Sequence, residues 1–120
     1  MRHTLTGNIQ RHLGFPSKTL GNRRDVLVYL PKGYRRSPRR RYPVLYLHDG
    51  QNVFDAATSF AGVEWGADET AHRLTAAKLI EPLIIVAVAN TGEDRIHEYA
   101  PTAARIDALK RMQSKGSLRN

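Results

Sequence analysis

Three short apolar runs alternate with polar segments along the chain. They cover residues 26–30, 44–47 and 83–89, and turn-favouring Pro, Gly, Asp or Asn residues flank each of them. Because the runs are continuous and rich in Val, Ile and Leu, they predict strands buried on both faces, as in a parallel sheet covered by helices. Residues 5–15 mix polar and apolar positions and predict a strand at the edge of that sheet.

One helical segment, residues 67–79, is predicted between the second and third runs. Ala67, Ala71 and Leu74 recur at intervals of three and four residues, and Glu69 with Arg73 forms a favourable i,i+4 pair. A strand, a helix and a strand at this spacing predict a right-handed βαβ crossover. The predicted fold class is therefore α/β, with a mostly parallel sheet and flanking helices.

Composition limits the chemistry that the chain can carry. The 120 residues are 41% hydrophobic and 25% charged, and they include no cysteine, which excludes disulfides, thiolate metal sites and a cysteine nucleophile. No apolar run approaches the roughly 20 residues of a membrane helix. The residues after Met-Arg-His do not form the apolar stretch of a secretory signal, so we expect a cytoplasmic location.

Positive charge is concentrated toward the ends of the chain. Residues 1–41 carry 11 Lys and Arg against one Asp, whereas residues 42–100 carry three basic and nine acidic residues. The densest basic run, residues 35–41, is interrupted by Ser and Pro and is typical of a solvated loop. A phosphate-binding patch usually adds interleaved aromatics, and here only Tyr34 and Tyr42 stand at the edges. The pattern favours the loop, and a non-catalytic basic fragment that binds nucleic acid nonspecifically is the alternative function.

Candidate chemistry follows the second apolar run directly. In open α/β sheets, ligands bind at the carboxyl ends of strands, and this run continues into His48, Asp49, Gly50 and Gln51. Gly50 permits a turn with positive φ, which would leave successive backbone N–H groups pointing outward, as an oxyanion hole requires. A simple strand-ending turn in which Asp49 caps its own backbone is the alternative.

A longer stretch around this turn resembles a known family. Residues 42–55, with the sequence YPVLYLHDGQNVFD, resemble the signature of the putative-esterase branch of the α/β-hydrolases. That branch includes enterochelin-esterase-like, feruloyl-esterase-like and mycolyltransferase-like enzymes. The resemblance runs in order from about residue 5 to residue 102 and corresponds to the N-terminal part of such a domain. It also includes residues 25–34, Trp65 with Asp68 and Glu69, and residues 83–101.

The resemblance implies a serine carboxylic-ester hydrolase that acts on small-molecule esters without a cofactor or metal. In that family, the residue after Asp-Gly donates its backbone N–H to the oxyanion hole. This implies that Gln51 is the donor, that Gly50 shapes the turn and that Asp49 supports the loop. No member of the catalytic triad is assigned, because no serine here lies in a Gly-x-Ser-x-Gly motif. The serines are Ser17, Ser37, Ser59, Ser114 and Ser117.

The resemblance also predicts where the domain ends within the chain. Residues 1–102 are predicted to form a partial α/β-hydrolase domain that stops before the nucleophile, and residues 103–120 a basic tail that is a short helix or disordered. We therefore expect a truncated form without ester turnover of its own. The edge of residues 43–47 would then be open to self-association. The histidines at 48, 72 and 97 lack a paired metal-ligand spacing, so no metal site is expected.

Overall fold

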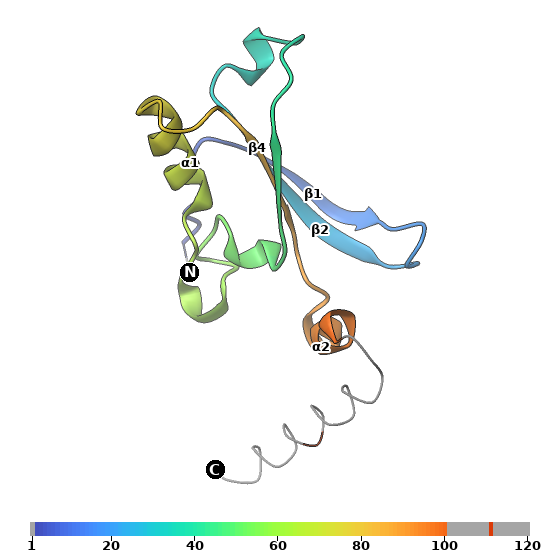
Figure 1. Cartoon of the computed structure of the whole chain (residues 1–120). Helices are drawn as coiled ribbons and strands as arrows, with labels where there is room; N and C mark the ends of the chain where they lie inside the picture. Colours follow the sequence, from blue (N-terminus) through green and yellow to red (C-terminus); the bar gives the residue numbers. More distant parts are fainter. Residues whose placement is uncertain (1, 101–110, 112–120) are drawn as a thin grey trace. The chain divides into compact units, whose positions relative to one another are not determined.

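A four-stranded mixed sheet organises the first ninety residues (Figure 1). The computed structural model describes residues 2–100 and residue 111. They fall into two compact units, divided after residue 90. The first contains the strands β1 (Asn8–Pro16), β2 (Arg23–Leu30), β3 (Val44–Leu47) and β4 (Ile84–Val88), and the helix α1 (Ala67–Ala76). The second contains a 3-10 turn, Gly92–Asp94, and the helix α2 (Arg95–Tyr99).

The strand order is β1-β2-β4-β3. The β1–β2 and β2–β4 pairs are antiparallel, and β3–β4 is parallel. Among the described strands, the parallel pairing expected from the sequence is therefore limited to β3 and β4, which α1 connects. All three apolar runs form strands as predicted, and residues 8–16 form the predicted edge strand. No helix within the described residues is long and apolar enough to cross a bilayer.

Helix α1 ends three residues earlier than predicted, for a reason found in its last turn. Lys78 has φ 59°, in the left-handed region. Its N–H donates to the Thr75 carbonyl, and the Leu79 N–H donates to the Leu74 carbonyl, both at 3.0 Å. This pair of bonds is a Schellman motif, which ends the helix and satisfies its free carbonyl groups.

Helix α1 and the segment after β3 cover one face of the sheet. Alternate residues of β2 and β4 point to this face, where Tyr29 lies opposite Ile85. Phe54 is 1% exposed and packs beside Tyr29, with the ring centroids 6.5 Å apart. The buried cluster on this face consists of Tyr29, Val53, Phe54, Ala71, Ile85 and Ala87.

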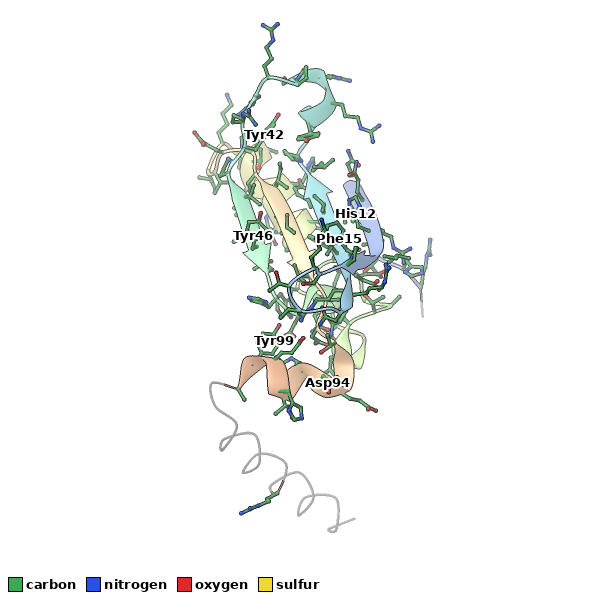
Figure 2. The ribbon with its side chains drawn as sticks, turned by 90° about the vertical axis from the view of Figure 1, so that its right-hand side faces the viewer. His12, Phe15, Tyr42, Tyr46, Asp94 and Tyr99 are labelled. Atoms are coloured by element: carbon green, nitrogen blue, oxygen red, sulfur yellow. The ribbon has the colours of Figure 1, made fainter. Side chains whose placement is uncertain are left out.

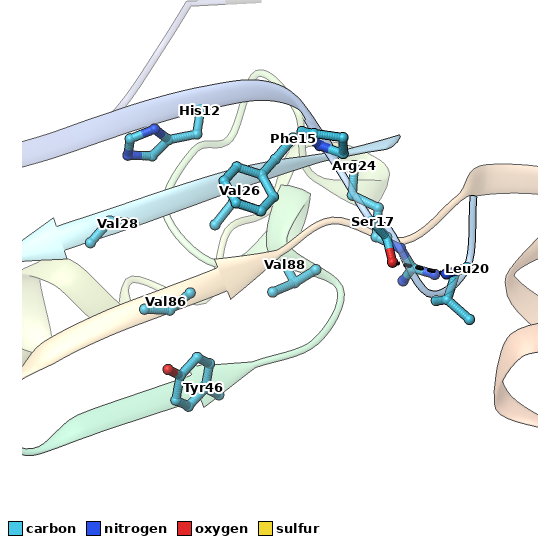
Figure 3. A pocket seen from close by; sticks show the side chains of 11 residues that line it. His12, Phe15, Ser17, Leu20, Arg24, Val26, Val28, Tyr46, Val86 and Val88 are labelled. Atoms are coloured by element: carbon cyan, nitrogen blue, oxygen red, sulfur yellow. Dashed lines mark hydrogen bonds between the residues drawn. The ribbon is translucent and has the colours of Figure 1, made fainter. Parts of the chain in front are cut away.

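Within residues 2–90, the opposite face is open (Figure 2). Val26 lies opposite Val88, and Val28 opposite Val86, and all four valines are only partly buried. Tyr46 on β3 is 70% exposed. A hollow of about 620 Å³ lies over these side chains, bordered on one side by the end of the β1–β2 hairpin (Figure 3). The sequence predicted burial on both faces, but the described residues cover only one.

Candidate oxyanion site

The turn that follows β3 begins with a strained residue rather than with the glycine. Asp49 has φ 54° and ψ 45°, in the left-handed region, and it precedes a 3-10 turn, η2 (Gly50–Asn52). Asp tolerates this region better than most residues because of its short polar side chain. Gly50 is not among the positive-φ residues, so the expectation that Gly50 supplies the positive φ is wrong.

Gly50 is required instead because of its close approach to β4. A Cβ atom at this position would lie 2.7 Å from the carbonyl carbons of Ala87 and Val88 and 2.8 Å from the Ala87 oxygen. These are backbone atoms near the carboxyl end of β4 and cannot rotate out of the way. The missing side chain therefore allows η2 to lie directly on the strand.

The backbone N–H of Gln51 is an uncommitted donor in this turn. The Asn52 N–H donates to the Asp49 carbonyl at 2.9 Å, and the Val53 N–H donates to the Gly50 carbonyl at 3.3 Å. The Gln51 N–H, between Gly50 and Asn52, has no acceptor within the described part of the chain. Because backbone N–H groups in folded proteins are almost always paired, an unpaired donor in a half-buried turn is available to a ligand.

Asn90 holds the turn against the end of β4. The Asn90 N–H donates to Gln51 Oε1 at 3.2 Å, and Asn90 Nδ2 donates to Asp49 Oδ1 at 2.9 Å. Asp49 thus supports the loop through Asn90, and its side chain does not cap the η2 backbone. The Gln51 carbonyl also accepts the Thr58 hydroxyl at 2.7 Å. The sequence gives no sign of this role of Asn90, because Asn90 lies 39 residues after Gln51 and only the folded structure brings the two together.

Asp55 fixes the segment that leaves the turn. This carboxylate is 4% exposed as a residue and accepts His3 Nδ1 at 2.6 Å, the Thr4 N–H at 3.0 Å and the Ala57 N–H at 3.1 Å. Burial acts to raise the Asp55 pKa, but these hydrogen bonds and the His3 charge outweigh it, so the pKa lies below its usual value. The N-terminal segment is therefore tied to the loop by a group that stays charged at neutral pH.

The hydroxyls of Ser59 and Ser17 are engaged in loop hydrogen bonds and are not placed as nucleophiles. The Ser59 hydroxyl donates to the Asp55 carbonyl at 2.7 Å, and Ser17 Oγ accepts the Leu20 N–H at 3.1 Å in the hairpin loop (Figure 3). Both hydroxyls therefore stabilise loops. Ser114 and Ser117, like the predicted tail at residues 103–120 apart from Arg111, lie outside the described residues.

Three carboxylates near the start of α1 lie close enough together to act as ligands of one cation. Oxygens of Glu64, Asp68 and Glu69 lie within 4.8 Å of one another. Asp68 Oδ2 also accepts the Thr6 N–H and hydroxyl, at 3.1 and 2.9 Å. Partial burial, a hydrogen bond with Asp68 and repulsion by both carboxylates raise the pKa of Glu69 to about 7. From the sequence, only histidines were candidate ligands, and this carboxylate cluster was not predicted because it forms where the N-terminal segment meets α1.

Comparison with solved structures finds similarity to a serine hydrolase and to an esterase. An IroE-like serine hydrolase from Shewanella oneidensis superimposes with a TM-score of 0.56 and 31% identity over 79% of this chain. A ferulic acid esterase gives 0.51 and 28% over 68% of the chain. The BES protein from Bacillus cereus gives 0.52 over 85% of the chain and, at 24% identity, supports the fold alone. No curated protein matches the chain.

The match to these proteins is partial in length. The chain covers 26% of the Shewanella hydrolase, 30% of the ferulic acid esterase and 37% of the BES protein. The family described as "Putative esterase" matches residues 17–116, which is most of the chain and includes β2 to α2 and the η2 turn. This chain therefore belongs to the putative-esterase family and has the N-terminal part of an α/β-hydrolase-like fold.

Proposed function

We propose that this chain contributes the N-terminal part of a serine carboxylic-ester hydrolase for small-molecule esters, with the Gln51 N–H as one oxyanion donor. The observation that carries the proposal is the uncommitted Gln51 N–H at the carboxyl end of β3. Ligands of open α/β sheets bind at this end of the strands. Membership of the esterase family, and the serine hydrolase and esterase among the structural neighbours, support ester chemistry.

The proposed role follows from how charge develops during ester cleavage. When a serine attacks the ester carbonyl carbon, the carbonyl oxygen becomes an oxyanion, and N–H groups already aimed at it lower the barrier. Loss of one such donor typically costs about 2.7–4 kcal/mol of transition-state stabilisation. The contacts of Gln51 with Asn90 and Thr58 hold this residue in place, so its backbone N–H needs little reorganisation to donate to the oxyanion. The second donor would be the N–H of the residue after the nucleophile.

These 120 residues do not carry out triad-based turnover by themselves in this proposal. None of the five serines lies in a Gly-x-Ser-x-Gly motif, and Ser59 already donates its hydroxyl to a backbone carbonyl. The oxyanion donor and the attacking hydroxyl are separate requirements, and only the first is supported here.

The test combines a covalent probe with a substrate. The purified chain is treated with a fluorophosphonate and analysed by intact mass, and a short-chain nitrophenyl ester is followed spectroscopically. We expect no adduct, and the same hydrolysis rate from the chain and from its Ser59→Ala variant. An adduct on any serine, or hydrolysis that Ser59→Ala abolishes, would show that the chain has a nucleophile and overturn this division of roles.

A further inference from the structure

The connection between β2 and β3 forms a strongly basic lobe. Residues 31–43, which we call the arginine lobe, include Lys32 and five arginines and no acidic residue. The lobe contains the short 3-10 turn η1 (Tyr34–Arg36) and lies at the amino end of β3, whereas the η2 turn lies at its carboxyl end (Figure 1). A function of the lobe is thus separate from the proposed oxyanion site.

The arginines of the lobe are free to meet an external anion. All five are exposed, and none forms an ion pair with a carboxylate in the described part of the chain. Figure 2 shows nitrogen-tipped side chains extending outward from this end of the molecule, with Tyr42 at the base of the lobe. The five are Arg35, Arg36, Arg39, Arg40 and Arg41.

Two tyrosines that stand eight residues apart in sequence meet at the centre of the lobe. The ring centroids of Tyr34 and Tyr42 are 5.7 Å apart at an interplanar angle of 40°, and the Arg40 guanidinium lies 5.0 Å from the Tyr42 centroid. Both rings line a hollow of about 400 Å³ together with Arg35 and Arg41. Tyr34 and Arg35 also border a second hollow of about 270 Å³. The lobe therefore combines aromatic faces with unpaired cations, which the sequence order does not show.

We propose that the arginine lobe binds single-stranded nucleic acid, with its arginines on the phosphates and a base against the Tyr34–Tyr42 pair. Proteins that bind single strands without sequence preference combine a basic groove with aromatic side chains and stacked arginines, as seen here. Unstacked bases expose the faces that such rings need, so a single strand fits better than a duplex. Residues 31–43 contain no Leu, Ile, Phe or Trp that could insert into a bilayer, so an anionic membrane fits less well.

The first test separates the lobe from the overall charge of the protein. Fluorescence anisotropy measures binding of a labelled oligothymidylate of about 12 nucleotides to the whole chain. With about four phosphates neutralised, affinity should fall roughly 50-fold between about 50 and 200 mM salt. Arg39→Gln/Arg40→Gln/Arg41→Gln should weaken binding at least about tenfold. The control Arg11→Gln/Lys18→Gln/Arg73→Gln removes the same charge from exposed positions elsewhere, and equal losses in the two variants would overturn the proposal.

The second test asks whether bases are recognised and uses the unaltered chain. An abasic phosphodiester strand of the same length should compete about tenfold less well than the oligothymidylate, because it cannot stack. Equal competition by the abasic strand, or tighter binding to phosphatidylglycerol vesicles than to the oligonucleotide, would contradict the proposal. Tyr34→Leu/Tyr42→Leu should reproduce the abasic loss, whereas Tyr46→Leu, an exposed tyrosine on β3 outside the lobe, should not.

Discussion

The two faces of the sheet are built from the same strands but differ in what covers them. Along β2 and β4, Tyr29 and Ile85 face α1 and the η2 segment and are at most 4% exposed. Their neighbours Val28 and Val86 face the open side and are only partly buried. Alternate residues of a strand point to opposite faces, so neighbouring apolar residues of β2 and β4 differ in how far they are buried. Apolarity therefore marks a residue that can be buried, whereas another segment must supply the cover.

The proposed oxyanion turn leads directly into the core of the covered face. Gly50 lies against the backbone of β4, and Val53 and Phe54, which follow the turn, are at most 1% exposed in the core. This packing of Gly50, Val53 and Phe54 therefore helps to set the position of the Gln51 amide. Changes on the open face should leave that amide in place.

Truncation of a core aromatic should have the largest effect on stability. Phe54→Ala should lower the free energy of unfolding by about 3–5 kcal/mol, because it leaves a cavity between β2, β4 and the turn. Tyr46→Ala, on the open face, is the matched control and should cost less than about 1 kcal/mol. Urea unfolding followed by circular dichroism measures both. Similar losses for the two variants would show that the faces do not differ in the way described.

A methyl group at Gly50 should have the next largest effect. Gly50→Ala would place a Cβ 2.7 Å from two backbone carbonyl carbons, so η2 must move away from β4 at a cost of about 1–3 kcal/mol. Gly33→Ala is the control, since a Cβ there meets no atom within 4 Å although its φ is 85°. Thermal unfolding should show a larger loss for Gly50→Ala. A larger loss at Gly33 would mean that positive φ matters more than close approach.

The open face should control association between copies of the chain. Among the described strands, β3 pairs with β4 alone, and Val44 and Tyr46 are 43% and 70% exposed. An exposed apolar edge strand favours pairing with another chain. Val44→Lys/Tyr46→Lys should reduce self-association in a sedimentation series over protein concentration and change unfolding by less than about 1 kcal/mol. Phe60→Lys, at an 85% exposed position away from the sheet edge, should not reduce it. If the chain stays monomeric at every concentration in the series, β3 does not mediate self-association.

The carboxylate cluster should give the smallest effect, visible only as a pH dependence. The Glu69 pKa is raised from 4.5 to about 7, so the folded state holds this proton more tightly than the unfolded state does. Its favourable contribution is complete below pH 4.5 and is lost as the pH rises toward about 7. Glu69→Gln should therefore flatten the stability profile across this window and be the more stable form above it. Because the Glu69 side chain is exposed, the difference should stay below about 1 kcal/mol. Parallel pH profiles for the two proteins would contradict the assignment.

Much of the fold could be predicted because apolar runs and turn residues are local signals. The strands of the three apolar runs, the edge strand and the start of α1 lie where the pattern placed them. The direction of the β2–β4 pairing and the open face could not be read in this way, because they depend on which segments meet in space. The early end of α1 depends on the left-handed conformation of Lys78, a residue type with no strong preference for that region.

The turn after β3 was predicted, but the reason given for its glycine was wrong. Family resemblance identified Gly50 and Gln51, but the positive φ belongs to Asp49, and the glycine is needed for its closeness to β4. The brace from Asn90 and the anchoring of Asp55 by His3 join residues 39 to 52 positions apart. Such long-range contacts between polar side chains leave no periodic signal in the sequence.

Amide hydrogen exchange at three consecutive residues shows whether the Gln51 N–H is free to act as an oxyanion donor. The Asn52 and Val53 N–H groups have backbone acceptors within the turn, whereas the Gln51 N–H has none in the described chain. Resolved by NMR, Gln51 should exchange at least about tenfold faster than Asn52 and Val53, because no bond must open first. Protection of Gln51 equal to that of its two neighbours would mean that its donor is already occupied, and the proposed oxyanion role would fail.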